Sequence, residues 1–312
     1  MEWEEKVKVV DKESEKSKVG IGVLVTAHHG QRVYLESCLR SVRDIGWVTL
    51  VYDNPGSIKH YPSDKCLALV DNFVVKHPTR IMPGPTFPQA FNFSIGSKLI
   101  DNPLVFVIGA DSVLEHPENL GDIVEMLMKE DGRIIACSTH NPKRHGSTPF
   151  CGTKSFLVHN HIFKVLMKRV ETTFIPFDHK YGNMENRFGW AIKKLGIKEV
   201  VVPELPGEDQ FSYGPWSSDG NVLNRGTWGK VLGFRHLRGE MVRRQIELQR
   251  PVELKYFDTQ YCSSQEKEVL TYWEVQDEVE KKIILEKWWS YNPIARKALE
   301  ERDKTTTLVK EV

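Results

Sequence analysis

Short apolar runs that alternate with helical patterns are the feature that most constrains the fold of this chain. Residues 20–26, 47–52 and 105–113 are rich in aliphatic and β-branched side chains, as buried strands are. Residues 32–44 carry apolar side chains near helical spacing, and residues 89–99 form a second expected helix after a Pro-rich loop. Strands that alternate with helices build a mostly parallel sheet with helices on both faces. We therefore expect an α/β fold.

The second half of the chain has a weaker pattern. Residues 204–260 show no clear period, which is typical of long loops over a site. Ser263 and Glu266 form a capping box that predicts the start of an amphipathic helix. The remaining expected elements are a helix at 121–131, a strand at 133–138, a strand passing into a helix at 155–169, a helix at 186–195 stopped by Gly196, and a strand at 197–202.

These patterns suggest three parts. We expect a flexible lead-in over residues 1–18, one large domain over 19–260 and a C-terminal helical extension over 261–312. Within the domain, residues 19–115 form the half nearest in pattern to a nucleotide-binding fold, and residues 116–260 form the other half. The apolar stripe of the expected amphipathic helix after Ser263 does not show what the C-terminal helices do or which oligomeric state the protein has.

Composition limits the setting of the protein. The net charge of +1 gives no global attraction to nucleic acid or to an anionic membrane. The five cysteines are odd in number and lack CxxC spacing, which fits reduced thiols. No run approaches the ~20 apolar residues of a membrane span, and the charged N-terminus lacks the apolar core of a signal sequence. We expect a soluble cytoplasmic protein without a transmembrane segment, in the host cytoplasm if the chain is viral.

Two carboxylates follow expected strands. Asp53 ends the second apolar run, and Asp111 ends the third. In an open α/β sheet, an acid at the carboxyl end of a strand lies in the crevice where ligands bind. The alternative is a local role, in which Asp111 caps the next turn and Asp53 belongs to an Asx-turn in Asp-Asn-Pro-Gly.

Four motifs follow one another along residues 19–204. They read GVLVTAHHGQRVYLESCLRSV, LVYDNPGS, FPQAFNFSIGSKLIDNPLVFVIGADSVL and FDHKYGNMENRFGWAIKKLGIKEVVVPE. In this order and spacing they resemble the family 2 inverting glycosyltransferases of GT-A fold. The resemblance implies a Rossmann-like GT-A domain that binds a nucleotide-sugar donor, a UDP-sugar being favoured. It also implies a hexosyltransferase that transfers the sugar to an acceptor hydroxyl with inversion.

The resemblance assigns a donor subsite. Asp53 corresponds to the nucleotide-binding acid, which accepts hydrogen bonds from uracil or ribose. Asn92 matches the helix asparagine that faces the donor, although an asparagine within a helix is often only solvent-exposed. The first strand ends where family members begin to contact the nucleotide, and an ordinary loop histidine is the alternative there. The residues at that end are Thr26, Ala27, His28 and His29.

The resemblance also implies a divalent cation, Mn²⁺ or Mg²⁺, held by a DxD-type motif against the donor diphosphate. This chain departs from the motif, because Gly109 replaces the first acid and leaves Ala110 and Asp111. One carboxylate can suffice, since hard cations keep waters and take ligands from phosphate. Many family members supply a late histidine to the metal, and His236 is the candidate. Basic side chains that could share the neutralisation are Lys143, Arg144 and Arg235.

The catalytic base is expected in the fourth motif. Family members carry an acidic pair before a helix, and here Asn186 replaces the second acid. Glu185 is therefore the candidate to deprotonate the acceptor hydroxyl, with Asp178 and His179 as fallback bases. The alternative for Glu185 is a helix N-terminal carboxylate stabilised by the helix dipole.

The acceptor is less constrained. Tyr213, Trp216 and Trp228 could stack on sugar or base rings, or could pack a long loop. The Arg-rich segment 235–250 could contact phosphates, or could form a solvated face. The acceptor is then a glycan or a modified base in DNA, as in a viral-type DNA glycosyltransferase.

Two other classes stay open. A catalytically inactive GT-A binding module would fit the losses at Gly109 and Asn186. A nucleotidyltransferase of related fold would need a Gly-rich phosphate loop after the first strand, and TAHHGQRVY lacks one.

Overall fold

The computed structural model describes residues 7–9, 20–54, 57–76, 86–129, 134–137, 155–174, 184–201, 232, 234–236, 254–262 and 277–291. The chain divides into two compact units. The first consists of residues 1–206 and 226–235, and the second of residues 207–225 and 236–312. The expected boundaries at residues 18 and 260 stay a prediction.

The first unit is built on a mostly parallel sheet, as the sequence predicts. Its strands lie in the order β1 (Val7–Val9), β4 (Asn72–Lys76), β3 (Trp47–Asp53), β2 (Ile21–His28), β5 (Leu104–Gly109), β9 (Ser155–His159), β7 (Ile134–Cys137) and β10 (Lys198–Val201). Strands β4, β3, β2 and β5 are parallel, and β7 is parallel to β10. Strand β9 is antiparallel to β5 and β7, and β1 is antiparallel to β4.

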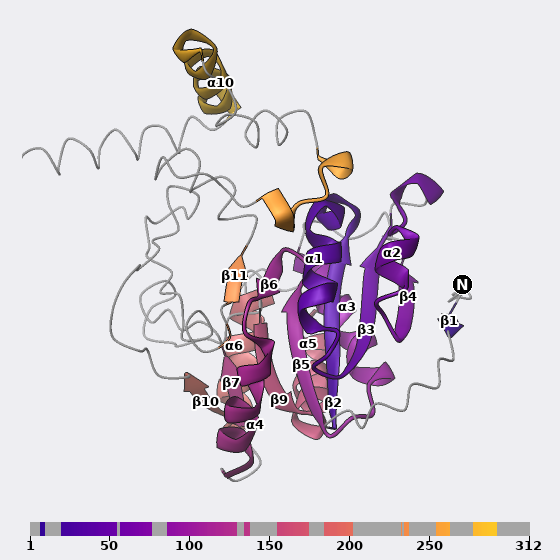
Figure 1. The fold of residues 1–312 in the computed structure, drawn as a ribbon. Coiled ribbons are helices and arrows are strands. Elements are labelled where there is room, and N and C mark those ends of the chain that lie inside the picture. The colour runs from indigo at the N-terminus through magenta and orange to yellow at the C-terminus, as the bar shows by residue number, and fades with distance from the viewer. Residues whose placement is uncertain are drawn as a thin grey trace, which may run out of the picture. The chain divides into compact units, whose positions relative to one another are not determined.

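Helices cover both faces of this sheet (Figure 1). One face packs against α1 (Arg32–Val42), α2 (Asp64–Leu67) and α4 (Leu120–Lys129). The other packs against α3 (Thr86–Leu99), α5 (Asn160–Phe174) and α6 (Met184–Leu195). Because both faces are buried, the strands read as nearly continuous apolar runs. The α/β class expected from the sequence is therefore confirmed.

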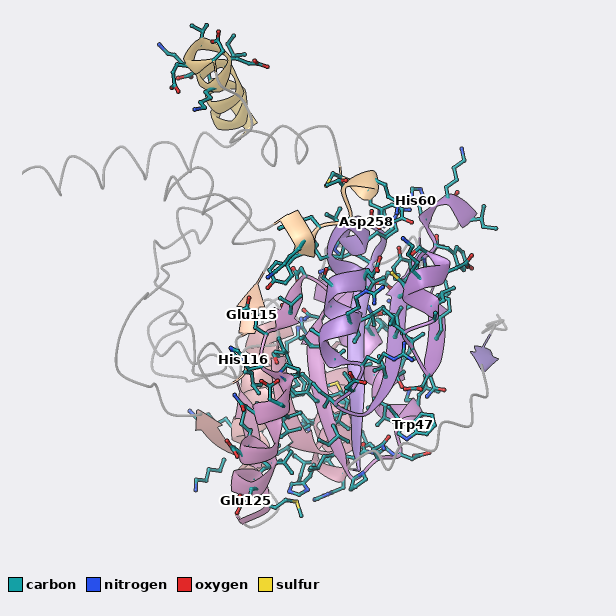
Figure 2. The ribbon with its side chains drawn as sticks, in the orientation of Figure 1. Trp47, His60, Glu115, His116, Glu125 and Asp258 are labelled. Atoms are coloured by element: carbon teal, nitrogen blue, oxygen red, sulfur yellow. The ribbon has the colours of Figure 1, made fainter. Side chains whose placement is uncertain are left out.

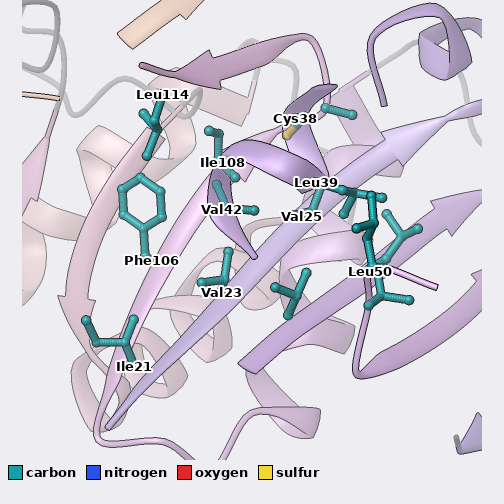
Figure 3. Packing of buried hydrophobic residues seen from close by; sticks show 14 of the residues in the cluster. Ile21, Val23, Val25, Cys38, Leu39, Val42, Leu50, Phe106, Ile108 and Leu114 are labelled. Atoms are coloured by element: carbon teal, nitrogen blue, oxygen red, sulfur yellow. The ribbon is translucent and has the colours of Figure 1, made fainter. Parts of the chain in front are cut away.

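Alternation along β2 shows how its side chains are shared between the faces. Val23 and Val25 belong to the cluster under α1, whereas Leu24 between them belongs to the cluster under α3. Figure 3 shows the first cluster, where Cys38 and Leu39 of α1 lie over β2 and β5. The two clusters, one on each face of the sheet, hold the central strands in place.

The strand order reverses beside β2. Strands β2, β3 and β4 follow one another in one direction, and the chain then returns to place β5 on the other side of β2. Ligands of open α/β sheets bind at such a switch point, outside the carboxyl ends of the strands. In register, His28 lies opposite Asp53, and Asp53 lies opposite Lys76. On the other side of β2, Thr26 lies opposite Gly109.

The third apolar run differs from its prediction. The single strand expected over 105–113 is two strands, because β5 ends at Gly109 and β6 (Ser112–Leu114) begins after a turn. Asp111 therefore lies in that turn and does not end a strand. Glycine and aspartate favour turns, and β6 leaves the large sheet to pair with β11 (Phe234–His236).

Other elements follow the sequence closely. The helix predicted over 186–195 is α6, and Gly196 after it has a φ of +64°, the left-handed conformation expected of a helix C-cap. Strand β1 lies within the lead-in and was not predicted from the sequence. The three residues of this strand are too few to give a periodic signal.

The second unit contributes the short helices η6 (Leu254–Tyr256) and η7 (Thr259–Tyr261) and the longer α10 (Glu278–Tyr291). Asp277 caps α10, because its Oδ1 accepts hydrogen bonds from the backbone N–H groups of Val279 (2.7 Å) and Glu280 (3.0 Å). The capping box at Ser263 and Glu266 lies outside the described residues. Among the helices that the structure describes, none is long and apolar enough to cross a membrane.

Candidate functional site

Three polar side chains meet at the carboxyl ends of β3 and β4. Asp53 ends β3 and is only 7% exposed, and Asn92 of α3 is 3% exposed. The Asn92 Nδ2 donates a hydrogen bond to Asp53 Oδ2 at 3.2 Å. The Lys76 Nζ, from the last residue of β4, lies 3.2 Å from Asp53 Oδ1. We call Asp53, Asn92 and Lys76 the Asp53 cluster.

The position of Lys76 is fixed from several sides. Its strand register places it directly opposite Asp53, and its backbone carbonyl accepts a hydrogen bond from the Asn54 N–H at 2.9 Å. Its ammonium also lies over the ring of Phe91, 5.1 Å from the centroid. Phe91 is 38% exposed, so an aromatic face borders the cluster at the surface.

Burial decides the electrostatics of Asp53. Removal from water raises the pKa of its carboxyl above the usual range. Three neighbours oppose this rise in the pKa: the charge of Lys76, the hydrogen bond from Asn92 and the nearby His29. The cluster thus holds a buried carboxylate with compensating partners, which is the kind of group found at binding sites.

Asn92 has an acceptor left over. Its Oδ1 is buried and has no hydrogen-bond partner among the residues that the structure describes. Buried polar atoms are normally satisfied, so such an atom calls for a partner from outside this set. Together with Asp53, it places two acceptors side by side, which suits a ligand that presents N–H or O–H donors.

Three histidines, His28, His29 and His60, lie near the same edge of the sheet. The ring of His29 lies 5.9 Å from that of His28 and 5.2 Å from that of His60, which ends η2 (Ile58–His60). Figure 2 shows His60 at the opposite end of the sheet from Trp47, the first residue of β3. Arg32 donates to the carbonyls of His29 (3.1 Å) and Lys59 (2.7 Å) and so joins the two loops.

His28 and His29 differ in their surroundings. The His28 Nδ1 accepts a hydrogen bond from the Gly30 N–H at 3.0 Å, and Gln31 Oε1 accepts one from the His28 N–H at 3.1 Å. This capping is the local structural role that the sequence left as an alternative. Partial burial and the charges of His60 and Arg32 lower the pKa of His29. At neutral pH, the His29 ring is therefore neutral.

Thr26, Ala27 and Ala110 can contribute only in limited ways. Ala27 and Ala110 belong to the apolar cluster under α1, so their side chains point into the core. The Ala110 N–H donates to the Thr26 carbonyl at 3.0 Å and joins β2 to the turn after β5. These residues shape the backbone at the switch point.

Asp111 lies on the other side of β2 from Asp53. Two strand spacings separate the ends of β3 and β5, which is about 10 Å. Asp111 is 1% exposed. The pKa of the Cys38 thiol on α1 is raised, first by the burial of the thiol and second by the charge of Asp111. Among the described residues, no group of three or more His, Cys, Asp or Glu side chains could hold a metal ion. The predicted cation site names two protein ligands, Asp111 and His236, and stays a prediction.

The predicted base and acceptor residues are not tested by the geometry. Glu185 and Asn186 lie in the first turn of α6, and His236 is the last residue of β11, which also contains Arg235. Their assigned roles stay predictions. The other predicted site residues lie outside the described residues: Lys143, Arg144, Asp178, His179, Tyr213, Trp216 and Trp228.

The structure adds residues that the sequence did not single out. Lys76, the last residue of β4, was assigned no role from the sequence. A cation at the carboxyl end of the strand next to Asp53 was a usable signal, because parallel neighbours end at the same edge. His60 and Phe91 have no such signal, since only the packing of η2 and α3 brings them to this edge.

Comparisons with known proteins complete the description. The chain matches no protein-family model and no curated protein. Among solved structures, S. aureus TarS residues 1–349 aligns with a TM-score of 0.36 and 13% identity over 55% of this chain. That alignment covers 54% of the TarS structure, about half its length. A Bacillus anthracis protein described as a glucose-1-phosphate thymidylyltransferase, solved with sucrose, aligns with a TM-score of 0.36 and 11% identity over 58% of this chain and 87% of its own.

Proposed function

We propose that this protein is an inverting glycosyltransferase that takes a hexose from a nucleoside diphosphate donor, with a UDP-sugar favoured. The acceptor is a hydroxyl of a glycan or of a modified base in DNA. Mn²⁺ or Mg²⁺ assists the reaction in this proposal, and Glu185 is the general base. The proposal combines the motif resemblance of residues 19–204 with the chemistry of the Asp53 cluster.

The observation that carries the proposal is the Asp53 cluster at the switch point of the sheet. A carboxylate that is 7% exposed and an amide that is 3% exposed present acceptors at the edge where such sheets bind nucleotides. Because an ionised carboxylate only accepts hydrogen bonds, Asp53 selects donors such as the imide N–H of uracil or the ribose hydroxyls. The exposed ring of Phe91 offers an apolar border to the same ligand.

The chemical step needs two further contributions. Glu185 removes the proton of the acceptor hydroxyl while that oxygen bonds to the anomeric carbon, and the nucleoside diphosphate leaves from the opposite face. A bound divalent cation supplies neutralisation of the leaving diphosphate in such reactions. In this proposal, Asp111 and His236 would hold the cation.

A donor-turnover assay tests the proposed reaction. Release of nucleoside diphosphate is measured with UDP-glucose, UDP-galactose, UDP-GlcNAc and GDP-mannose, each with and without Mn²⁺. We expect turnover with a UDP-sugar, and a higher rate with the cation. Nucleotide binding without turnover, also in the presence of glycan and DNA acceptors, would favour the inactive binding module. No binding and no turnover under any condition would overturn the proposal.

Substitution Glu185→Gln tests the base. Transfer to the acceptor should fall by about 10²-fold or more, because general base catalysis typically contributes 10²–10⁴-fold. Donor affinity, measured by calorimetry, should stay within about twofold, since the base acts on the acceptor. Retained transfer would remove Glu185 from this role and leave Asp178, or another residue such as His179, as the base.

A further inference from the structure

The Lys76 ammonium lies 3.2 Å from the buried Asp53 carboxylate, which the proposed function assigns to the donor. We propose that Lys76 is a positioning residue of the donor subsite, which keeps the Asp53 carboxylate ionised and in place without itself contacting the donor. The inference rests on the proposed function for the identity of the ligand. It rests on the geometry of the Asp53 cluster for the role of Lys76.

The contacts of Lys76 fit this role. Its Nζ lies 3.2 Å from Asp53 Oδ1, whereas the other carboxylate oxygen accepts from Asn92. The side chain of Lys76 is 17% exposed and the ring of Phe91 lies under its ammonium, so the cation is directed at the carboxylate. An ion pair with so little exposure is screened much less by salt than a surface pair.

The other charges near Asp53 do not replace Lys76. In the described part of the chain, the titratable groups that act on Asp53 are Lys76 from β4 and His29 from η1 (His29–Gln31), and α3 contributes the neutral Asn92. Burial lowers the pKa of His29, and the neighbouring His60 and Arg32 lower it further, so its ring is neutral at pH 7. Lys76 is then the cation that opposes the desolvation of the carboxylate.

The first experiment needs no ligand. Urea unfolding is measured between pH 4 and pH 8 for the wild type and Lys76→Met, each also in an Asp53→Asn background. Without Lys76, Asp53 should hold its proton to higher pH, so the stability difference between Lys76→Met and wild type should change with pH. In the Asp53→Asn background, the effect of Lys76→Met should not depend on pH. The same effect in both backgrounds would overturn the inference.

The second experiment measures UDP affinity by calorimetry over the same pH range. The ratio of the Kd of Lys76→Met to that of the wild type cancels the titration of the phosphate groups of UDP. If Lys76 keeps Asp53 ionised, this ratio should be largest at low pH. The pH at which Lys76→Met loses half of its UDP affinity should lie about one pH unit or more above the corresponding pH for the wild type. Lys76→Arg should restore the wild-type profile, because it restores the cation.

A direct contact between Lys76 and the diphosphate predicts the opposite trend. UDP gains negative charge as pH rises, so the ratio would then be constant or would grow with pH. Either result would overturn the positioning role. Lys164→Met is the matched control, because Lys164 forms an exposed ion pair with Asp101 at 3.3 Å on the same unit. It should change neither profile.

The two experiments fail in different ways. If UDP, GDP-mannose and the UDP-sugars do not bind the wild type at any pH, the proposed function fails, while the unfolding experiment still decides whether Lys76 controls Asp53. If nucleotides bind but Lys76→Met leaves both the unfolding and the binding profiles unchanged, the proposed function stands and the inference about Lys76 is wrong. If Lys76→Met does not fold, Lys76→Gln is used in both experiments.

Discussion

At the scale of single residues, Asp53 binds its proton more tightly in the folded chain than in the unfolded chain. Because burial raises its pKa, folding favours the protonated carboxyl. Its contribution to stability is therefore fully present below the unfolded pKa of about 3.8 and is lost as the pH rises through the folded pKa. At neutral pH, the buried carboxylate therefore costs stability.

Asp53→Asn should separate these two effects. At pH 7 we expect the urea midpoint to equal or exceed that of the wild type, because a neutral amide of the same shape replaces a desolvated charge. This advantage should disappear near pH 4, where the wild-type carboxyl is protonated. Binding of UDP, measured by calorimetry, should fall about tenfold or more at pH 7, which is ~1.4 kcal/mol.

The control for this substitution is Asp101→Asn, since Asp101 is 91% exposed and its ion pair is at the surface. Its urea midpoint should show no comparable dependence on pH. A loss of stability for Asp53→Asn at pH 7 would contradict the sign of the pKa shift.

Asn92→Ala has a matched control on helix α5. Asn92 and Asn160 are both buried asparagines that donate one side-chain hydrogen bond, Asn92 to Asp53 and Asn160 Nδ2 to the Ile100 carbonyl at 2.7 Å. Each alanine substitution should lower the free energy of unfolding by about 1–3 kcal/mol, because a buried group loses its partner. Only Asn92→Ala should also weaken UDP binding. Equal nucleotide affinity in the two variants would remove Asn92 from the donor subsite.

Site residues were predictable where a motif names both partners. The resemblance predicts Asp53 and Asn92 in one subsite, and the structure joins them although 39 positions separate them. Lys76 was not predicted, because its role depends on the register of β4 against β3. The prediction that Asp111 ends a strand was wrong, since Gly109 and Asp111 favour a turn and β6 follows at once.

At the scale of elements, the close approach of α3 to β2 positions Asn92. A Cβ on Gly96 would collide with both methyl groups of Leu24, which is fully buried in β2. Gly96→Ala should therefore push α3 away from the sheet and lower the free energy of unfolding by about 1–3 kcal/mol. The midpoint temperature of thermal unfolding should fall, because the packing is disturbed. The affinity for UDP should also fall, because Asn92 lies on the displaced helix.

Gly121→Ala is the control for this prediction. A Cβ on Gly121, near the start of α4, meets no atom within 4 Å. This substitution should leave stability unchanged or raise it by about 0.4–1 kcal/mol, because alanine restricts the unfolded chain. If Gly96→Ala behaves in the same way, the contact between α3 and β2 does not limit the position of Asn92.

Most elements of the first unit were predictable because their periodicity is strong. The elements expected over 20–26, 32–44, 47–52 and 89–99 begin and end within three residues of β2, α1, β3 and α3. Strand directions were not predictable in the same way. Residues 155–159 read as a strand in the sequence, but only pairing with β5 and β7 shows that β9 runs antiparallel.

At the scale of the whole molecule, a bound donor should stabilise the fold that it binds. UDP at about 100 times its Kd should raise the free energy of unfolding by ~2.7 kcal/mol through linkage alone. If a cation assists donor binding at Asp111, Mn²⁺ should enlarge this stabilisation and excess EDTA should reverse the increase. Thermal unfolding with UDP, with and without Mn²⁺, measures the effect.

Asp111→Asn distinguishes a cation at Asp111 from a cation elsewhere. The added effect of Mn²⁺ should disappear in this variant, while the stabilisation by UDP alone should remain. If Mn²⁺ acts equally on both proteins, Asp111 is not a metal ligand. The same scan without ligand compares the stability of Asp111→Asn with that of the wild type. This comparison is needed because Asp111 is 1% exposed, so the substitution can also change the stability of the fold.

The sequence alone determined the α/β class and most of the predicted strand and helix positions of the first unit, because periodicity and turn chemistry are local. The motif resemblance named Asp53 and Asn92 separately as candidates for the donor subsite, and their hydrogen bond came only from the structure. The tertiary structure decided the rest. It set the antiparallel direction of β9, the departure of β6 from the large sheet and the place of Lys76 beside Asp53. These features depend on which strands pair and in what register, and contacts between distant segments leave no periodic trace in the sequence.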